Sequence, residues 1–372
     1  MTEPARSPGE TIAVVADLHL AGGGDDPFTD DGRFAETVDG LLSGASGRRL
    51  RLVLLGDTVD FPAVGLEGRR ATPATHPGEA VAKLHRVLAA HPAVLDALRR
   101  VVGAGHRVDV VAGNHDMELM VPAVQRCLRD AVGGGPDDVA VHPWMLHVPG
   151  VVYAEHGQQH HDVNRFPELG AGCPPGDRRL RVPAGSYVDA LAHLRRRQPD
   201  ASTPALLAQA ARLGVGLAGG LVRLSRAERH REHRERRLAT ALPAALPPAA
   251  VLGIDRVAAA TPSSIARRAA AMAAARLRGP AAGPTVPYMQ AAAQAVHHVL
   301  DAEGCAVPFY VFGHTHVAVD VPLVETPTAR YLNPGTWSSM TRRVPGGDRR
   351  FGVVVIERES GAAPRAELRG PT

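Results

Sequence analysis

The chain has 372 residues, of which 45% are hydrophobic, and this length allows one large catalytic domain with a sizeable insertion. Its three cysteines stand at wide, unpatterned spacing, which argues against a disulfide framework or a thiolate zinc site and fits a reducing compartment. The formal net charge of +4 mildly favours anionic substrates, but with Lys83 as the single lysine, the arginine count is a poor guide to nucleic-acid binding.

The chain begins with a polar segment and continues with short apolar runs of β character. Residues 1–10 contain no apolar segment of a secretory signal, so we expect a cytoplasmic protein. A strand buried on both faces of a parallel sheet gives a continuous apolar run. Five such runs predict five strands, at residues 12–16, 52–55, 108–112, 151–154 and 307–312.

Helices are expected between these strands. Residues 77–102 have helical apolar spacing that is interrupted near Pro92, and another helix should begin at the polar block of residues 113–116. A closing strand is expected at residues 351–356.

Residues 174–287 have a different character, because strand-like runs stop and alanine, leucine and arginine recur at helical spacing between prolines. We predict a helical insertion. Two interpretations remain open: a cap that covers a pocket and selects the substrate, or a helical hairpin that only packs on the core. Residues 206–224 are apolar but too short and interrupted to span a membrane. With the arginine-rich residues 223–237, they could form a peripheral contact with an anionic membrane, although a solvated helix is the simpler interpretation.

Each apolar run is followed by a short polar block, at the end of its predicted strand. In open α/β sheets, ligands gather at the carboxyl ends of the strands, so these blocks should converge on one site. A lone histidine in a core, or a Gly-Asn turn, would need no function. Five blocks in the same position favour a site; they contain Asp17 and His19, Asp57 and Asp60, Asn114 to Asp116, His156, and His314 and His316.

The five blocks resemble the motif series of calcineurin-like metallophosphoesterases over residues 11–60, 108–165 and 307–356. The resemblance implies an α/β sandwich of two facing mixed β-sheets flanked by helices, with a dinuclear metal centre between strand-end loops. We therefore expect a discontinuous catalytic domain over residues 11–173 and 288–360. A helical insertion would occupy residues 174–287, and residues 1–10 and 361–372 would be flexible termini.

The resemblance also implies the ligands of two metal ions, with Asp57 bridging them. The first ion would be held by Asp17, His19, Asp57 and His316. The second would be held by Asp57, the Asn114 carbonyl oxygen, His156 and His314. Oxygen and imidazole ligands suit Mn²⁺, Fe, Zn²⁺, Co²⁺ or Ni²⁺, and we favour Mn²⁺.

Two further side chains match catalytic positions of that family. His115 would donate a proton or hydrogen bond to the leaving oxygen, and Asp60 would orient its ring. The alternative for Asp60 is a helix N-cap. Asp116 either supports a ligand or caps the helix that follows.

The fourth block offers three imidazoles in six residues, and we favour His156 as the ligand because it follows the apolar run. Many relatives carry a further histidine where this chain has Gln158. We expect His160, His161 and Arg165 to bind substrate, because arginine suits phosphate; the alternative is an ordinary polar loop.

These residues predict a dinuclear metal-dependent phosphoesterase that hydrolyses a mono- or diester by metal-activated hydroxide. The alternative is a pyrophosphohydrolase of a nucleotide- or lipid-linked precursor. Phe61 stands where phosphoprotein phosphatases usually carry arginine, which disfavours a protein substrate. We expect a phosphorylated small-molecule or lipid-linked substrate. A nuclease is less favoured, and so is a silent binding module, because every ligand position is filled.

Overall fold

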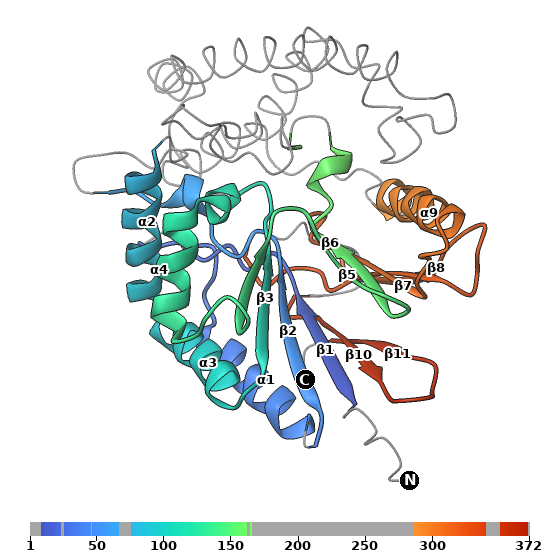
Figure 1. Ribbon diagram of the computed structural model, residues 1–372. Coiled ribbons are helices and arrows are strands. Elements are labelled where there is room, and N and C mark those ends of the chain that lie inside the picture. The colour runs from blue at the N-terminus through green and yellow to red at the C-terminus, as the bar shows by residue number, and fades with distance from the viewer. Residues whose placement is uncertain are drawn as a thin grey trace, which may run out of the picture.

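The computed structural model describes residues 9–23, 26–45, 47–66, 76–161, 164–165, 286–339 and 350–370. These residues form two β-sheets that face each other, with helices on both outer sides (Figure 1). Apart from its last two residues, the predicted insertion of residues 174–287 lies outside the described residues, so its helices and its role at a pocket or a membrane stay predictions. Within the described part of the chain, every helix is too short or too polar to cross a bilayer.

The first sheet has six strands in the order β11-β10-β1-β2-β3-β4. Strands β1 to β4 are parallel to one another, whereas β10 pairs antiparallel with both β1 and β11. The strands are β1 (Glu10–Val15), β2 (Arg49–Leu55), β3 (Arg107–Val111), β4 (Val139–His142), β10 (Val353–Arg358) and β11 (Arg365–Arg369).

The second sheet has five strands in the order β5-β6-β7-β9-β8. Strands β6, β7 and β9 are parallel, and antiparallel strands lie at both edges. The strands are β5 (Met145–Val148), β6 (Val152–Glu155), β7 (Phe309–Phe312), β8 (Val319–Pro322) and β9 (Arg330–Asn333). Because β6 pairs with β7, the segments on either side of the predicted insertion meet in one sheet.

The helices begin at residues suited to that position. The Asp30 side chain caps α1 by accepting a hydrogen bond from the Arg33 N–H at 3.0 Å. Helices α2, α3 and α4 each have proline in their first turn, where its missing N–H is not needed. The described α-helices are α1 (Asp31–Gly44), α2 (Pro77–Ala90), α3 (Pro92–Gly103), α4 (Pro122–Val132) and α9 (Val286–Ala302). Short 3-10 helices are η1 (Phe61–Ala63), η2 (Met117–Met120) and η3 (Gln158–His160).

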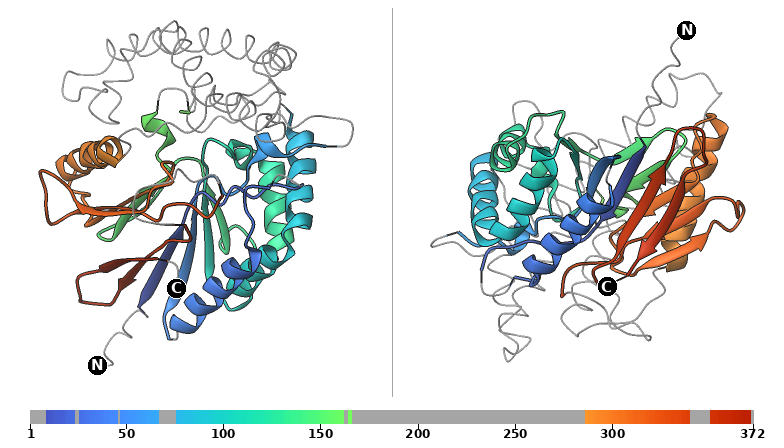
Figure 2. Two further views of the ribbon diagram at one scale, coloured as in Figure 1. Left: turned by 180° about the vertical axis from the view of Figure 1, so that it is seen from behind. Right: turned by 90° about the horizontal axis from the view of Figure 1, so that it is seen from below.

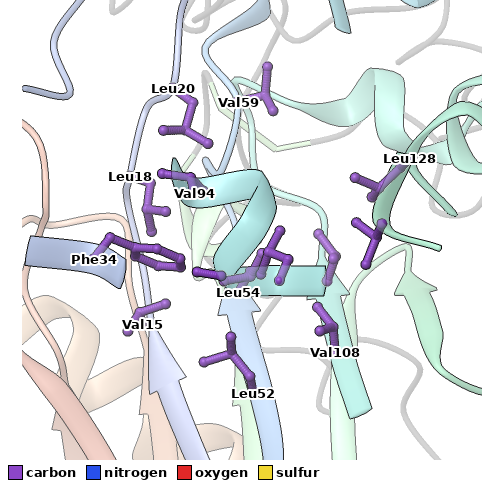
Figure 3. Close-up of a cluster of buried hydrophobic side chains, with 14 of the residues drawn as sticks. Val15, Leu18, Leu20, Phe34, Leu52, Leu54, Val59, Val94, Val108 and Leu128 are labelled. Carbon is purple, nitrogen blue, oxygen red and sulfur yellow. The ribbon is translucent and has the colours of Figure 1, made fainter. Parts of the chain in front are cut away.

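Three apolar clusters hold these layers together. Alternate residues of β1 face opposite sides of the sheet, so Val15 packs against helices and Val14 packs between the sheets. Figure 3 shows strand residues such as Leu54 beside Phe34 of α1 and Val94 of α3. A third cluster packs α9 on the outer face of the second sheet, and Figure 2 shows this helix opposite α1 to α4. The predicted class, two facing mixed sheets flanked by helices, is confirmed.

The five predicted strands correspond to β1, β2, β3, β6 and β7, and the helical segment of residues 77–102 is divided at Pro92 as expected. Two features differ from expectation. The block at residues 113–116 is followed by η2, and α4 begins only at Pro122. The segment of residues 361–372, expected to be a flexible terminus, contains β11, which pairs with β10. This strand is amphipathic and half exposed, so it has no apolar run to reveal it.

Candidate metal and catalytic site

The polar blocks lie at the carboxyl ends of β1, β2, β3, β6 and β7, and the fold brings them together. The described residues contain three groups of acidic and histidine side chains whose ligand atoms all lie within 4.8 Å of one another. The groups are Asp17, His19 and His316; His19, Asp57 and His115; and Asp57, His156 and His314. These residues could hold metal, and they come from distant segments: His19 and His316 are 297 residues apart in the sequence.

The backbone is strained where these side chains are held. Five of the six described non-glycine residues with positive φ belong to the predicted site. They are Asp17 (56°), His19 (56°), Asp57 (49°), His314 (67°) and His316 (60°). Such a conformation costs on the order of 1–3 kcal/mol for a residue with a side chain, and it clusters at sites that require a fixed geometry.

Two glycines allow the strand-end loops to approach each other. A Cβ atom at Gly56 would lie 2.3 Å from Cγ of His156, and one at Gly113 would lie 2.2 Å from Oδ1 of Asp57. Both distances are far shorter than a normal contact, so neither position accepts a side chain without displacing a candidate ligand.

The first candidate group joins the loops after β1 and β7. Oδ1 of Asp17 lies 3.1 Å from Nε2 of His316, and Nε2 of His19 lies 3.2 Å from the same nitrogen. Burial is the main cause that lowers the pKa of His19, which favours the neutral form of its ring. A neutral imidazole is the form that binds metal.

The second group joins the loops after β2, β6 and β7. Nδ1 of His156 lies 3.0 Å from the Leu55 carbonyl oxygen, which directs Nε2 toward Asp57, 3.2 Å from Oδ2. Burial opposes a charge on His156, but the carboxylates of Asp57 and Asp17 outweigh it and raise its pKa to about 9. Burial and the neighbouring His156 hold the pKa of His314 well below its usual range.

Two buried atoms of these groups fit a bound cation. Oδ1 of Asp17 and Nε2 of His156 make no hydrogen bond among the described residues. Buried polar atoms are normally paired, and a divalent ion would satisfy both with the hard oxygen and imidazole donors that such ions accept. Asn114 is also buried beside them, and its predicted role as a ligand stays a prediction.

His115 and Asp60 form the pair that was expected from the sequence. Nδ1 of His115 lies 3.0 Å from Oδ1 of Asp60, and its Nε2 lies 3.9 Å from Oδ2 of Asp57. Burial opposes ionisation of Asp60, but His115 and His19 outweigh it and hold its pKa well below the usual range. The same oxygen accepts from the Ala63 N–H at 3.2 Å, so Asp60 contacts His115 and also caps η1, while its role in orienting that ring stays a prediction.

Asp116 supports the ligand loops and makes no side-chain cap of η2. Its Oδ1 accepts from the Gly113 N–H at 2.6 Å, and its Oδ2 accepts from the Thr58 N–H at 2.7 Å. Burial and the charge of Asp57 raise the pKa of Asp116 to about 7. The carboxyl group of Asp116 thus links the loop that carries Asp57 to the loop of residues 113–116.

His160 is not part of the metal-ligand groups. Its Nε2 pairs with the buried carboxylate of Glu155, and its ring stacks on Phe312 with centroids 5.6 Å apart. Glu155 also accepts from Trp144 Nε1 at 2.8 Å and from the Tyr153 hydroxyl at 2.9 Å. These contacts join the ends of β6 and β7, and the predicted substrate contact of His160 stays a prediction.

The remaining residues of the fourth block lie closer to the ligands. The rings of His161 and His314 have centroids 5.6 Å apart, and Nδ2 of Asn164 lies 3.3 Å from Nε2 of His314. Arg165 follows and is buried. Gln158 donates to the Ala112 carbonyl oxygen at 3.1 Å, so it links the loops after β6 and β3. Asn164 was not predicted as a site residue, and its position in this block was the only sequence signal.

No family model and no curated protein matches the sequence. Among solved structures, the chain is similar to a Staphylococcus aureus protein described as a 5′-nucleotidase, in complex with α-ketoglutarate, with 10% identity and a TM-score of 0.34. That alignment covers 97% of this chain and 54% of the other, so this chain spans about half its length. A phosphopantetheinyl hydrolase from Mycobacterium tuberculosis is 13% identical with a TM-score of 0.29, covering 91% of this chain and 94% of the other. Neither match, at these values, establishes the function of this chain.

Proposed function

We propose that this protein hydrolyses a phosphate ester with two divalent metal ions. The position of Asp57 between two ligand groups carries this proposal. Its Oδ2 lies 3.7 Å from Nε2 of His19 and 3.2 Å from Nε2 of His156. Because an imidazole of each group lies near this carboxylate, Asp57 would contribute to the binding of both ions.

The proposed ligands follow from this arrangement. Asp17, His19, Asp57 and His316 would hold one ion, and Asp57, Asn114, His156 and His314 would hold the other. When bound, two such ions neutralise phosphoryl oxygens and favour ionisation of an attacking water. We propose Mn²⁺ as the preferred ion because the donors are carboxylate, amide and imidazole groups.

The protein itself would supply the proton for the leaving group. The Asp60 carboxylate holds Nδ1 of His115, and this leaves Nε2 directed toward Asp57 and the ligands. As the bond between phosphorus and the leaving oxygen breaks, the proton on Nε2 of His115 moves to that oxygen. The nearby charge of Asp60 stabilises the protonated ring before the transfer. General acid catalysis of this kind contributes about 10²–10⁴-fold in rate.

The substrate would enter beside His314. His161 and Arg165 lie in the loop next to this ring, and the planar guanidinium of arginine matches two phosphate oxygens. We propose a phosphorylated small molecule or a lipid-linked precursor as the substrate class. The loop belongs to the segment that leads into the predicted insertion.

Metal-dependent hydrolysis of p-nitrophenyl phosphate and bis-p-nitrophenyl phosphate tests this proposal. Protein stripped of metal would receive Mn²⁺, Zn²⁺, Co²⁺, Ni²⁺ or Mg²⁺ in turn. We expect turnover to return with metal in the wild type and to be lost in Asp57→Asn. Asp109→Asn is the matched control, because Asp109 is another buried carboxylate, bonded to His142 at 2.6 Å within the sheet. No turnover on either ester with any metal would refute an ester hydrolase of broad specificity, and a pyrophosphate substrate would be tried next.

A further inference from the structure

The chain's single lysine is buried beside the turn that carries Asp60. Lys83 belongs to α2 and is 1% exposed. The chain has 42 lysines and arginines in total, and all the others are arginines. A buried ammonium group is unfavourable unless hydrogen bonds and opposite charges compensate it. The contacts of Lys83 therefore indicate what this residue does.

The ammonium group of Lys83 connects α2 to His115, the proposed proton donor, through hydrogen bonds of Phe61. Nζ of Lys83 donates to the Phe61 carbonyl oxygen at 3.1 Å. The Phe61 N–H donates to the His115 carbonyl oxygen at 3.2 Å. Asp60, the residue before Phe61, accepts from the His115 ring at 3.0 Å. Lys83 and His115 thus hold the Asp60–Phe61 turn from its two sides.

Charge compensation comes from both loops that form the site. Burial lowers the pKa of Lys83, and the charges of Glu118, Glu79 and Asp60 oppose this effect. Glu118 is a buried residue of η2, three residues after His115. The ammonium group therefore lies where the loop after β2 and the loop after β3 meet. It is compact and offers three donors in different directions, which a planar guanidinium group does not.

We infer that Lys83 is a positioning residue for His115, acting through the Phe61 carbonyl and the Asp60 turn. The inference rests on the proposed function, in which His115 protonates the leaving oxygen. Loss of the ammonium group should release the turn and misalign His115, while the metal ligands keep their places.

The first test compares esters with good and poor leaving groups. Lys83→Met keeps an unbranched side chain that is one atom shorter than lysine, and it removes the charge and the donors. In the metal-loaded enzyme we expect kcat on phenyl phosphate to fall about 10²-fold further than kcat on p-nitrophenyl phosphate, because only the poorer leaving group needs the proton. Lys83→Arg should not restore the rate. In a His115→Ala background, Lys83→Met should cause no further loss.

Leu84→Ala is the matched control, because Leu84 is the next residue of α2 and is fully buried in the apolar cluster between the first sheet and its helices. It should reduce stability and affect both esters equally. The inference is overturned if Lys83→Met lowers both rates by one common factor, or if its effect adds to that of His115→Ala.

The second test needs no turnover. Because Lys83 is the only lysine, selective isotope labelling gives one Nζ resonance in an NMR spectrum. We expect slow exchange of its protons with water and a shift of the resonance in Asp60→Asn. Fast exchange, or no response to Asp60→Asn, would contradict the inference. If the wild type shows no turnover with any metal, the proposed function fails on its own, and the NMR result still decides whether Lys83 is linked to the Asp60 turn.

Discussion

Raising the pH should remove a measurable part of the protein's stability through His91. This residue lies between α2 and α3, with Nδ1 2.9 Å from Oδ1 of Asp31 and Nε2 2.8 Å from Oδ2 of Asp26. Burial opposes a charge on the ring, but the two carboxylates outweigh it and raise the pKa of His91 to about 9. A protonated imidazole donates from both nitrogens, so it can bond both carboxylates at once.

The magnitude follows from the difference between the folded and unfolded states. The pKa of His91 rises from 6.5 to about 9 on folding, and each pKa unit corresponds to about 1.4 kcal/mol. Because the folded-state pKa is the higher one, the stabilisation is full below pH 6.5 and is lost as the pH rises through about 9. The charge of His91 should contribute about 3 kcal/mol at about pH 6 and less than about 1 kcal/mol at about pH 9.

Urea unfolding of the metal-free wild type and His91→Gln measures this effect. Glutamine can donate a hydrogen bond but cannot become charged in this pH range. The difference in unfolding free energy between the two proteins should therefore decrease steadily from about pH 6 to about pH 9.5. Other groups titrate in both proteins and cancel in the difference. A difference that stays constant over the range would show that folding does not raise the pKa of His91, and the reasoning would be refuted.

Three further predictions concern the site. His115→Ala should retain metal, measured by elemental analysis, and lose about 10²–10⁴-fold in kcat on esters with poor leaving groups; loss of metal would instead make His115 a ligand. Gly113→Ala should destabilise the protein by about 1–3 kcal/mol, because the new methyl group meets Asp57, and it should weaken metal binding in a calorimetric titration. The control is Gly103→Ala, whose methyl group would lie in open space and should leave metal binding unchanged. His160→Ala should reduce the unfolding free energy by about 1–3 kcal/mol because it removes one partner of the buried Glu155 carboxylate, and an effect confined to KM would favour substrate binding.

The sequence predicts which side chains lie together because its signal is local. Asp57 and His314 follow the buried ends of β2 and β7, each after a single glycine. Within each sheet the parallel strands have these ends at one edge, so an apolar run followed by a polar block indicates both the strand and the position of the block. This rule brings together the blocks after β1, β2 and β3 and, separately, those after β6 and β7, whereas the meeting of the two sets depends on how the two sheets pack.

The contacts that depend on three-dimensional placement could not be predicted. Lys83 meets a backbone carbonyl 22 residues away, and no pattern in the sequence identifies an acceptor of that kind. Asp116 could cap a helix or support a loop, and the choice depends on whether η2 or an α-helix follows it. His160 carries the same imidazole as His156, and only the pairing of β6 with β7 directs it to Glu155 and Phe312.

The strain at the site is balanced by hydrogen bonds from the surrounding loops. Asp17 has positive φ, but its carbonyl oxygen accepts from the Thr336 hydroxyl at 2.8 Å and from the Trp337 N–H at 3.2 Å. Oδ2 of Asp17 accepts from the His314 N–H at 3.0 Å, while its Oδ1 remains without a hydrogen bond. The chain thus fixes one carboxylate oxygen through the backbone and leaves the other directed at the ligand group. A metal ion would meet ligand atoms that already lie within 4.8 Å of one another. Binding would then require little rearrangement of the chain, which favours affinity because the ordering of these loops is complete before the ion arrives.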